Sequence, residues 1–197
     1  MPALDPKAWI NLESVQLLLL DDHPEGAGIL TQIISALGVR HFFRCSTLAE
    51  AQQVAIEREI HLIVVNANLK SSNAFEFIEW LRRADIQPTS YAPTIMITGH
   101  TQKSNVERAR DCGTNSIIAK PVSPISVLER IVWVAKEKRP YVQSESYFGP
   151  DRRFRNDGAP VGTPGRRYND TSAATPGTST VSPAGFGSSL AKKAVSQ

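Results

Sequence analysis

Five short apolar segments alternate with longer amphipathic segments over residues 15–138, and this alternation is the feature that most constrains the fold. The apolar segments lie at residues 15–20, 41–45, 61–66, 94–98 and 116–119. Segments of this length that are apolar nearly throughout are typical of parallel strands covered by helices on both faces. We therefore expect an α/β fold with a doubly wound, five-stranded parallel sheet.

The intervening segments have apolar residues at helical spacing and recognisable helix ends. They predict helices at residues 25–37, 47–58, 73–84, 102–112 and 124–138, with a loop at 88–92. Thr47 and Glu50 have the spacing of a capping box, and Gly38 stands where a helix end favours a left-handed backbone. One domain is thus predicted at residues 13–138, after an N-terminal segment of residues 1–12.

The composition and the charge change after residue 138. Residues 1–138 have 14 Lys and Arg against 15 Asp and Glu, whereas residues 139–197 have 8 against 4. Of the 59 residues in this basic tail, 26 are Gly, Pro, Ser or Thr, so few side chains can offset the entropy of ordering it. We expect the tail to be mostly disordered, with a docking segment at 141–155, where aromatic residues stand beside arginines.

Cysteine content and hydropathy exclude several protein classes. Cys45 and Cys112 are the two cysteines and lie far apart, so neither a disulfide framework nor a zinc site is indicated, and we expect reduced, packed thiols. The longest apolar run, residues 15–20, is too short to cross a membrane, and the acidic N-terminus is unlike a secretory signal. A cytoplasmic protein without a membrane span is expected.

Polar residues stand where four of the predicted strands end. Asp21 and Asp22 follow the first strand, Asn66 ends the third, Thr98 ends the fourth, and Lys120 follows the fifth. Because the carboxyl ends of parallel strands meet at one edge of the sheet, these side chains should converge on one crevice.

This arrangement resembles the receiver (CheY-like) domain of two-component response regulators. The motifs that carry the resemblance are Asp21-Asp22-His23-Pro24, the segment Pro93-Thr94-Ile95-Met96-Ile97-Thr98, and Ile117-Ile118-Ala119-Lys120-Pro121. They stand in the family's order and spacing, and the resemblance covers residues 13–138. It implies a flavodoxin-type sheet in the strand order 2-1-3-4-5 and a role in phosphorelay signal transduction.

The resemblance also implies roles for single residues. Asp21 and Asp22 match the acidic pair that holds Mg²⁺, and Asn68 matches the position whose backbone carbonyl is a further metal ligand. Thr98 and Lys120 match the hydroxyl and the ammonium group that bind phosphoryl oxygens.

Two positions depart from the family pattern. Asn66 stands where the family has its phosphoacceptor aspartate, and Ile117 stands where it usually has the aromatic residue that changes rotamer on activation. An amide cannot form an acyl phosphate. Asparagine also lacks the negative charge of an aspartate. At about 4 Å from a metal ion, that charge is worth on the order of 4 kcal/mol for each unit of opposing charge, before the cost of desolvation. We therefore expect no tightly bound cofactor and only weak Mg²⁺ binding. A decayed site, an amide that locks one signalling state, and an introduced substitution all remain open.

Three further residues near this crevice have simple interpretations. For Lys120 without a phosphate we expect an ion pair with Asp21 or Asp22. His23 and His100 are interpreted as loop residues, because two histidines without a spaced third ligand do not make a metal site.

The favoured function is a single-domain pseudo-receiver that acts by protein contacts. We expect it to bind a protein partner through the face of its fourth helix, fifth strand and fifth helix, and not to be an enzyme or a sequence-specific DNA-binding protein. The alternative is a working receiver that accepts phosphate on another residue or on deamidated Asn66. A flavodoxin-like oxidoreductase is disfavoured because no glycine-rich phosphate loop follows the first strand.

The arginines of the tail allow two interpretations. The simpler one is a solvated tail with weak affinity for polyanions. The more specific one is binding of an anion or a nucleotide, because guanidinium groups form paired hydrogen bonds with phosphates and donate hydrogen bonds to the O6 and N7 atoms of guanine. The short segment 147–153 resembles the arginine-rich extension of some receiver proteins that bind cyclic di-GMP. The candidate residues are Arg152, Arg153, Arg155, Arg166 and Arg167.

Overall fold

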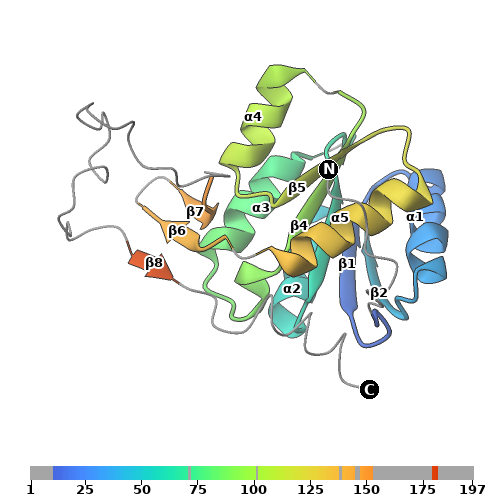
Figure 1. Ribbon diagram of the computed structural model, residues 1–197, viewed down its shortest axis with the longest axis horizontal. Coiled ribbons are helices and arrows are strands. Elements are labelled where there is room, and N and C mark those ends of the chain that lie inside the picture. The colour runs from blue at the N-terminus through green and yellow to red at the C-terminus, as the bar shows by residue number, and fades with distance from the viewer. Residues whose placement is uncertain are drawn as a thin grey trace.

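The protein has a five-stranded parallel sheet in the predicted order, β2-β1-β3-β4-β5 (Figure 1). A computed structural model describes residues 11–70, 72–100, 102–137, 139–144, 147–152 and 179–181. The strands are β1 (Gln16–Leu20), β2 (His41–Cys45), β3 (Leu62–Asn66), β4 (Thr94–Thr98) and β5 (Ser116–Ala119). The predicted fold class and strand order are confirmed.

Helices cover both faces of the sheet, with α1 and α5 on one face and α2, α3 and α4 on the other (Figure 1). The helices are α1 (Pro24–Ala36), α2 (Leu48–Glu57), α3 (Ala74–Arg83), α4 (Lys103–Asp111) and α5 (Pro124–Lys136). Because side chains alternate across a strand, Leu17 and Leu19 pack in the first of these two cores, and Leu18 and Leu20 pack in the second.

The helix ends follow from local sequence. The capping box between Thr47 and Glu50 is present, and Gly38 and Gly113 have φ angles of 107° and 96° in the left-handed region. Gly113 is also close to the later chain, because a Cβ atom there would lie 2.9 Å from the carbonyl oxygen of Phe148. The predicted loop at 88–92 differs from the structure, since a short 3-10 helix, η1 (Thr89–Tyr91), forms within it.

Part of the chain after residue 138 packs against the domain. The strands β6 (Tyr141–Gln143) and β7 (Phe148–Pro150) pair in antiparallel fashion, and β8 (Ser179–Val181) pairs with the other edge of β6. We call residues 139–144 and 147–152 the C-terminal strap. It lies beside α3 in Figure 1. The predicted disorder of the tail concerns residues that otherwise lie outside the described part of the chain.

An aromatic cluster joins the C-terminal strap to the domain. Tyr141 and Phe148 from the strap meet Tyr91 of η1, with ring centroids 5.2 to 6.0 Å apart. The hydroxyl of Tyr141 donates to the carbonyl oxygen of Tyr91 at 2.8 Å. Burial raises the pKa of Tyr141.

A buried arginine, Arg82 of α3, lies directly beneath this cluster. Its side chain is 1% exposed, and its guanidinium carbon lies 5.3 Å from the ring centroid of Tyr141. Its nitrogens donate five hydrogen bonds of 2.6 to 3.1 Å, to the carbonyl oxygens of Ser90, Ala92 and Gly113 and to the side-chain oxygens of Thr94 and Asn115. These bonds tie together α3, η1, the start of β4 and the loop before β5.

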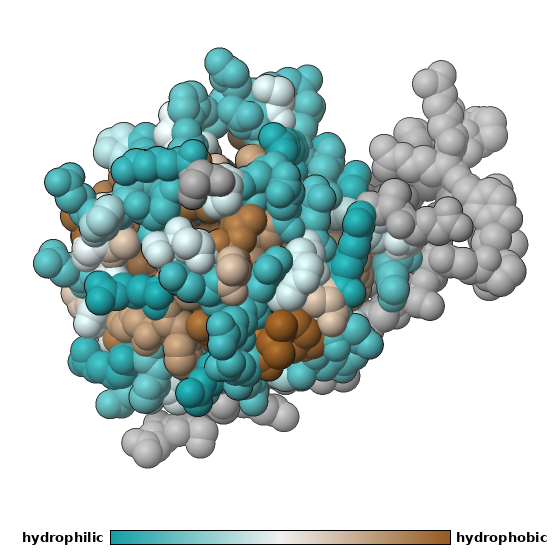
Figure 2. Space-filling model, turned by 180° about the vertical axis from the view of Figure 1, so that it is seen from behind, coloured by the Kyte–Doolittle hydropathy of each residue, from teal (hydrophilic) through white to brown (hydrophobic). Residues whose placement is uncertain are grey.

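Figure 2 shows the side opposite α5, where apolar residues form small patches among hydrophilic ones. None of the helices in the described part of the chain combines the length and the apolarity needed to cross a membrane.

Candidate functional site

The carboxyl ends of β1, β3, β4 and β5 bring four predicted site residues together at one edge of the sheet. Asp21 follows β1, Asn66 and Thr98 end β3 and β4, and Lys120 follows β5. The side chains of Asp21 and Lys120 both hydrogen bond to that of Asn66, at 2.9 and 3.2 Å. The peptide bond that precedes Pro121 is cis.

The amide of Asn66 is fully buried and bonded on both sides. Its nitrogen donates to Asp21 Oδ1 at 2.9 Å and to the carbonyl oxygen of Asn68 at 3.4 Å. Its oxygen accepts from the backbone N–H of Asn68 and from Lys120 Nζ, both at 3.2 Å. Exchanging the two amide atoms would set oxygen against acceptors and nitrogen against donors, so the partners fix the orientation. The NH₂ group therefore lies between Asp21 and the Asn68 carbonyl.

His23 lies in the loop between β1 and α1, as predicted, and its side chain also belongs to the acidic cluster. Its Nδ1 lies 2.8 Å from Asp22 Oδ1 and 3.3 Å from Asp21 Oδ1, and its backbone N–H donates to Asp21 Oδ1. Because α1 begins at Pro24, His23 is held as the extended N-cap residue of that helix, and its ring turns toward the preceding acids. Asp22 is held in turn by the backbone N–H of Lys70.

Lys120 does not form the predicted ion pair with Asp21 or Asp22. Its ammonium group donates to the oxygen of Asn66, and no carboxylate of the described residues comes within 4.0 Å of it. The physical reason is that the Asn66 amide lies between Lys120 and Asp21, with its oxygen toward the ammonium group and its NH₂ toward the carboxylate.

Thr98 and His100 form a second small network at the end of β4. The backbone N–H of His100 donates to Thr98 Oγ1 at 3.0 Å, and this hydroxyl donates to the carbonyl oxygen of His100 at 3.2 Å. The side-chain amide of Asn68 meets His100 Nδ1 at 2.9 Å. His100 is therefore bonded to two of the predicted site residues, which its interpretation as a plain loop residue did not foresee.

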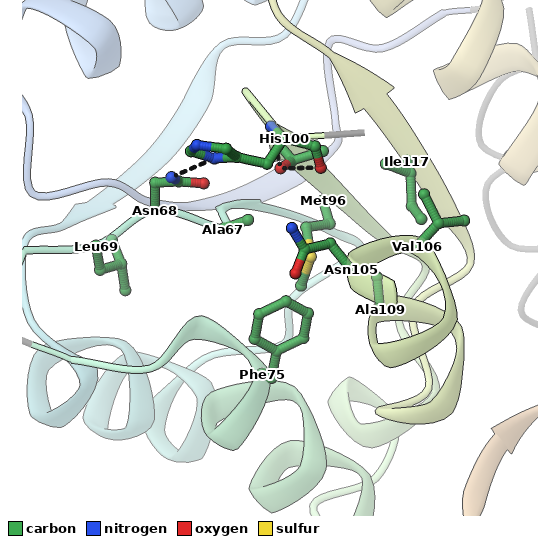
Figure 3. A pocket seen from close by; sticks show the side chains of 11 residues that line it. Ala67, Asn68, Leu69, Phe75, Met96, His100, Asn105, Val106, Ala109 and Ile117 are labelled. Carbon is green, nitrogen blue, oxygen red and sulfur yellow. Dashed lines mark hydrogen bonds between the residues drawn. The ribbon is translucent and has the colours of Figure 1, made fainter. Parts of the chain in front are cut away.

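A pocket of about 290 Å³ adjoins the crevice between α3, α4 and β4 (Figure 3). Phe75 and Met96 lie on one side of it, and Val106 and Ile117 lie on another. Ile117 is half-buried and stands opposite Met96 in the sheet register. An isoleucine at this position fills less of the pocket than an aromatic side chain would.

Arg152 is the one tail arginine among the five candidates that the structure describes. Its Nη1 lies 3.2 Å from Asp111 Oδ1, at the end of α4, and its guanidinium carbon lies 3.9 Å from the ring centroid of Tyr147. Arg152 thereby connects the C-terminal strap to α4. Arg153, Arg155, Arg166 and Arg167 lie outside the described residues.

Both cysteines are free and buried, as expected. Burial, together with the nearby charge of Glu50, raises the pKa of the Cys45 thiol to about 11. Burial also raises the pKa of Cys112. Neither thiol is therefore a nucleophile at neutral pH.

Comparison with known proteins agrees with this geometry. The model of the response regulator receiver domain family matches residues 17–132. The chain is 23% identical over 109 residues to a probable chemotaxis protein CheY of Rhizobium etli, which covers 55% of this chain and 83% of that protein. It is 27% identical over 115 residues to the polar-differentiation response regulator DivK of Brucella ovis, covering 58% and 91%.

Solved structures show the same fold. The chemotaxis response regulator CheY4 of Vibrio cholerae superposes with a TM-score of 0.55 at 20% sequence identity. The match covers 62% of this chain and 99% of that one.

Proposed function

Because the chain belongs to the family of response regulator receiver domains, we propose that it is a pseudo-receiver, a receiver-like protein that signals without accepting a phosphoryl group. In this proposal it acts in the cytoplasm, as part of a two-component pathway. It works by binding a protein partner, and not as an enzyme or a DNA-binding protein. The observation that supports it is the buried amide of Asn66 at the end of β3, bonded to Asp21 and Lys120.

The position of Asn66 lacks the atom that phosphoryl transfer needs. An ionised carboxylate offers two oxygens that can attack phosphorus, whereas the lone pair of an amide nitrogen is delocalised into the carbonyl group. The oxygen of Asn66 is also engaged by two donors, the backbone of Asn68 and Lys120. The site therefore has neither the charge nor the free oxygen of an acceptor.

The Mg²⁺ site of the family does not fit these residues well. Mg²⁺ requires oxygen ligands in a near-octahedral arrangement. Here a hydrogen-bond donor, the NH₂ group of Asn66, lies against both Asp21 Oδ1 and the Asn68 carbonyl. Binding of Mg²⁺ would require that amide to turn and to give up its hydrogen bonds, so we propose that Mg²⁺ binds weakly.

We further propose that Asn66 holds the protein in one signalling state. Its amide has five hydrogen-bond contacts, one each to Asp21, His23 and Lys120 and two to the backbone of Asn68, and so links the acidic pair to Lys120. A neutral link of this kind relieves the repulsion that a third carboxylate would add. The network gives the residue a structural use, which favours a locked state over simple decay.

For the partner surface we propose the face formed by α4, β5 and α5. In α4, Ala109 is the buried residue, so few buried contacts hold this helix to the sheet. Val106 of the same helix is 39% exposed beside the pocket, and the strap reaches the end of α4 through Asp111. A surface helix held by few contacts can shift to fit a partner.

The decisive experiment incubates the full chain with Mg²⁺ and a small phosphodonor such as acetyl phosphate, followed by intact mass spectrometry. We expect no gain of about 80 Da in the wild-type chain. The variant Asn66→Asp is the matched control and should gain it. A stable gain in the wild-type chain would support the alternative of a working receiver. Peptide mapping would then show whether deamidated Asn66 or another residue carries the phosphate.

A second candidate function, binding of cyclic di-GMP by the tail, is favoured by the stacking of Arg152 on Tyr147. A guanidinium group close to an aromatic ring can donate hydrogen bonds to the O6 and N7 atoms of a guanine base that stacks nearby. Calorimetry with cyclic di-GMP should give heat with the wild-type chain and little with Arg152→Ala. Equal heats, or none with either chain, would remove this candidate.

A further inference from the structure

We infer that the pocket between α3, α4 and β4 is a binding site for a small aromatic carboxylate, a ligand of one or two rings. The site goes beyond the proposed function and does not depend on it, because no phosphoryl group takes part. It gives the protein a chemical input of its own.

The inner part of the pocket is apolar. Phe75, Met96 and Ala109 line it and are at most 9% exposed. Val106 and Ile117 line it from another side (Figure 3). An apolar lining of this kind favours a ligand that is itself apolar over most of its surface.

The size of the pocket limits the ligand. An apolar cavity of about 150 Å³ can hold benzene, and the sites of drug-sized molecules begin at about 300 Å³. This pocket, at about 290 Å³, lies between these two cases. It therefore suits one ring or two fused rings.

Two of the lining side chains favour an aromatic ligand over an aliphatic one. The ring of Phe75 can pair with a second ring in an offset or edge-to-face arrangement, which stabilises the pair beyond the area that it buries. The thioether sulfur of Met96 also makes favourable contacts with aromatic rings. Both side chains lie on the same side of the pocket in Figure 3.

Hydrogen-bond donors line the pocket on its polar side. The side-chain nitrogen of Asn68 lies 2.9 Å from His100 Nδ1, so Nδ1 accepts and Nε2 carries the proton of the neutral ring. Asn105 of α4, which is half-buried, adds the NH₂ group of its amide. A carboxylate is an acceptor-only group and suits such donors.

The charge around the pocket also favours an anion. None of the described residues that line it is acidic. The guanidinium group of Arg108 lies against the ring of Phe75, with its carbon 4.4 Å from the ring centroid. A positive charge beside the lining attracts an anionic ligand, and no negative charge within the lining opposes it.

The helix α4 forms the outer wall of the pocket and leaves it accessible. Val106 is 39% exposed, and Ala109 is the buried residue of this helix. A helix that few buried contacts hold in place can move outward enough to admit a ligand. The ligand can then enter from solvent.

The test is calorimetric titration of the full chain with 2-naphthoate. Its uncharged analogue, 2-naphthamide, and its saturated analogue, decahydro-2-naphthoate, serve as reference ligands. We expect 2-naphthoate to bind with a Kd below about 1 mM, and about threefold or more tighter than either analogue. Absence of binding at this concentration, or equal binding of either analogue, would overturn the inference.

The substitution Ile117→Phe tests the location of the site. The added ring occupies the space of the ligand, so 2-naphthoate should bind at least about tenfold more weakly. The matched control is Ile29→Phe, because Ile29 is 57% exposed on α1, and this variant should bind like the wild-type chain. Equal affinities of Ile117→Phe and the wild-type chain would refute this location.

The substitution Asn105→Asp tests the charge of the ligand. A carboxylate at position 105 should weaken 2-naphthoate binding by about tenfold and change that of 2-naphthamide by less than about twofold. Asp is also compatible with the first turn of α4, so this variant keeps the test decisive even if Ile117→Phe does not fold, which circular dichroism shows. An equal effect on both ligands, or none on 2-naphthoate, would contradict a carboxylate at this position.

Discussion

Replacing Arg82 by methionine should destabilise the domain strongly, although Arg82 lies far from the predicted site. Methionine retains much of the length and apolar bulk of arginine but none of its donors. Three of the five acceptors keep another partner. The Thr94 hydroxyl and the carbonyl oxygen of Ala92 stay bonded to each other, and Asn115 Oδ1 accepts from the backbone N–H of Thr94. The carbonyl oxygens of Ser90 and Gly113 lose the donor they have in Arg82.

The magnitude follows from these two acceptors. A buried acceptor left without a donor costs about 1–3 kcal/mol, so two of them cost about 2–6 kcal/mol. Removing a buried guanidinium also removes its desolvation cost, which offsets part of this loss. We expect the free energy of unfolding to fall by about 3 kcal/mol, which lowers Tm by about 6–12 °C for a chain of this size.

Urea denaturation and calorimetry of the wild-type chain and Arg82→Met measure this change. Arg83→Met is the matched control, because Arg83 is the exposed neighbour on α3, and it should stay within about 0.5 kcal/mol of the wild-type chain. Arg82→Lys should fall between the two, since an ammonium group retains the charge but cannot reach five acceptors. A loss of less than about 1 kcal/mol in Arg82→Met would refute the reasoning.

Three further predictions concern the site and the cores. The variant Asn66→Asp should be less stable than the wild-type chain by about 1–3 kcal/mol at neutral pH without metal, because a third carboxylate then faces Asp21 and is only partly offset by Lys120. The new side chain repels Asp21 only when it is ionised, so in thermal melts the deficit should grow as pH rises and the acid ionises, and shrink as pH falls and it is protonated. Ile117→Phe should fill part of the 290 Å³ pocket and raise Tm, whereas Ile117→Ala should lower it; a lower Tm for both would show that the pocket does not admit a ring. The pKa of about 11 for Cys45 means that its alkylation by iodoacetamide should be slow at pH 8. Because that pKa is raised on folding from 9.0, the stability it contributes should be present below pH 9 and lost as pH rises toward 11, which denaturation at a series of pH values measures.

Local patterns determined most of the fold. Apolar strands, the capping box at Thr47 and the glycine at position 38 depend on residues close together in the sequence. Their effects can therefore be predicted from the sequence alone. The rule that parallel strands end at one edge then predicted where Asp21, Asn66 and Lys120 would meet, without any knowledge of their contacts.

Contacts between distant segments could not be predicted in this way. The place of the Asn66 amide between Asp21 and Lys120 depends on side-chain orientations from three strands. The turn of His23 toward the acids depends on how α1 leaves the sheet. In α3, Arg82 has the pattern of an ordinary basic residue near a helix end, yet it is buried because acceptors from several segments surround it.

The sequence by itself therefore determined the class of fold, the order of its elements and the edge at which its polar residues gather. Only the tertiary structure decided that the strap packs on the domain, that Lys120 bonds to an amide instead of an acid, and that His23 joins the acidic pair. The physical reason is range: helix and strand formation depends on neighbours along the chain, whereas hydrogen-bond partners and burial depend on which distant groups the folded chain brings within about 3 Å.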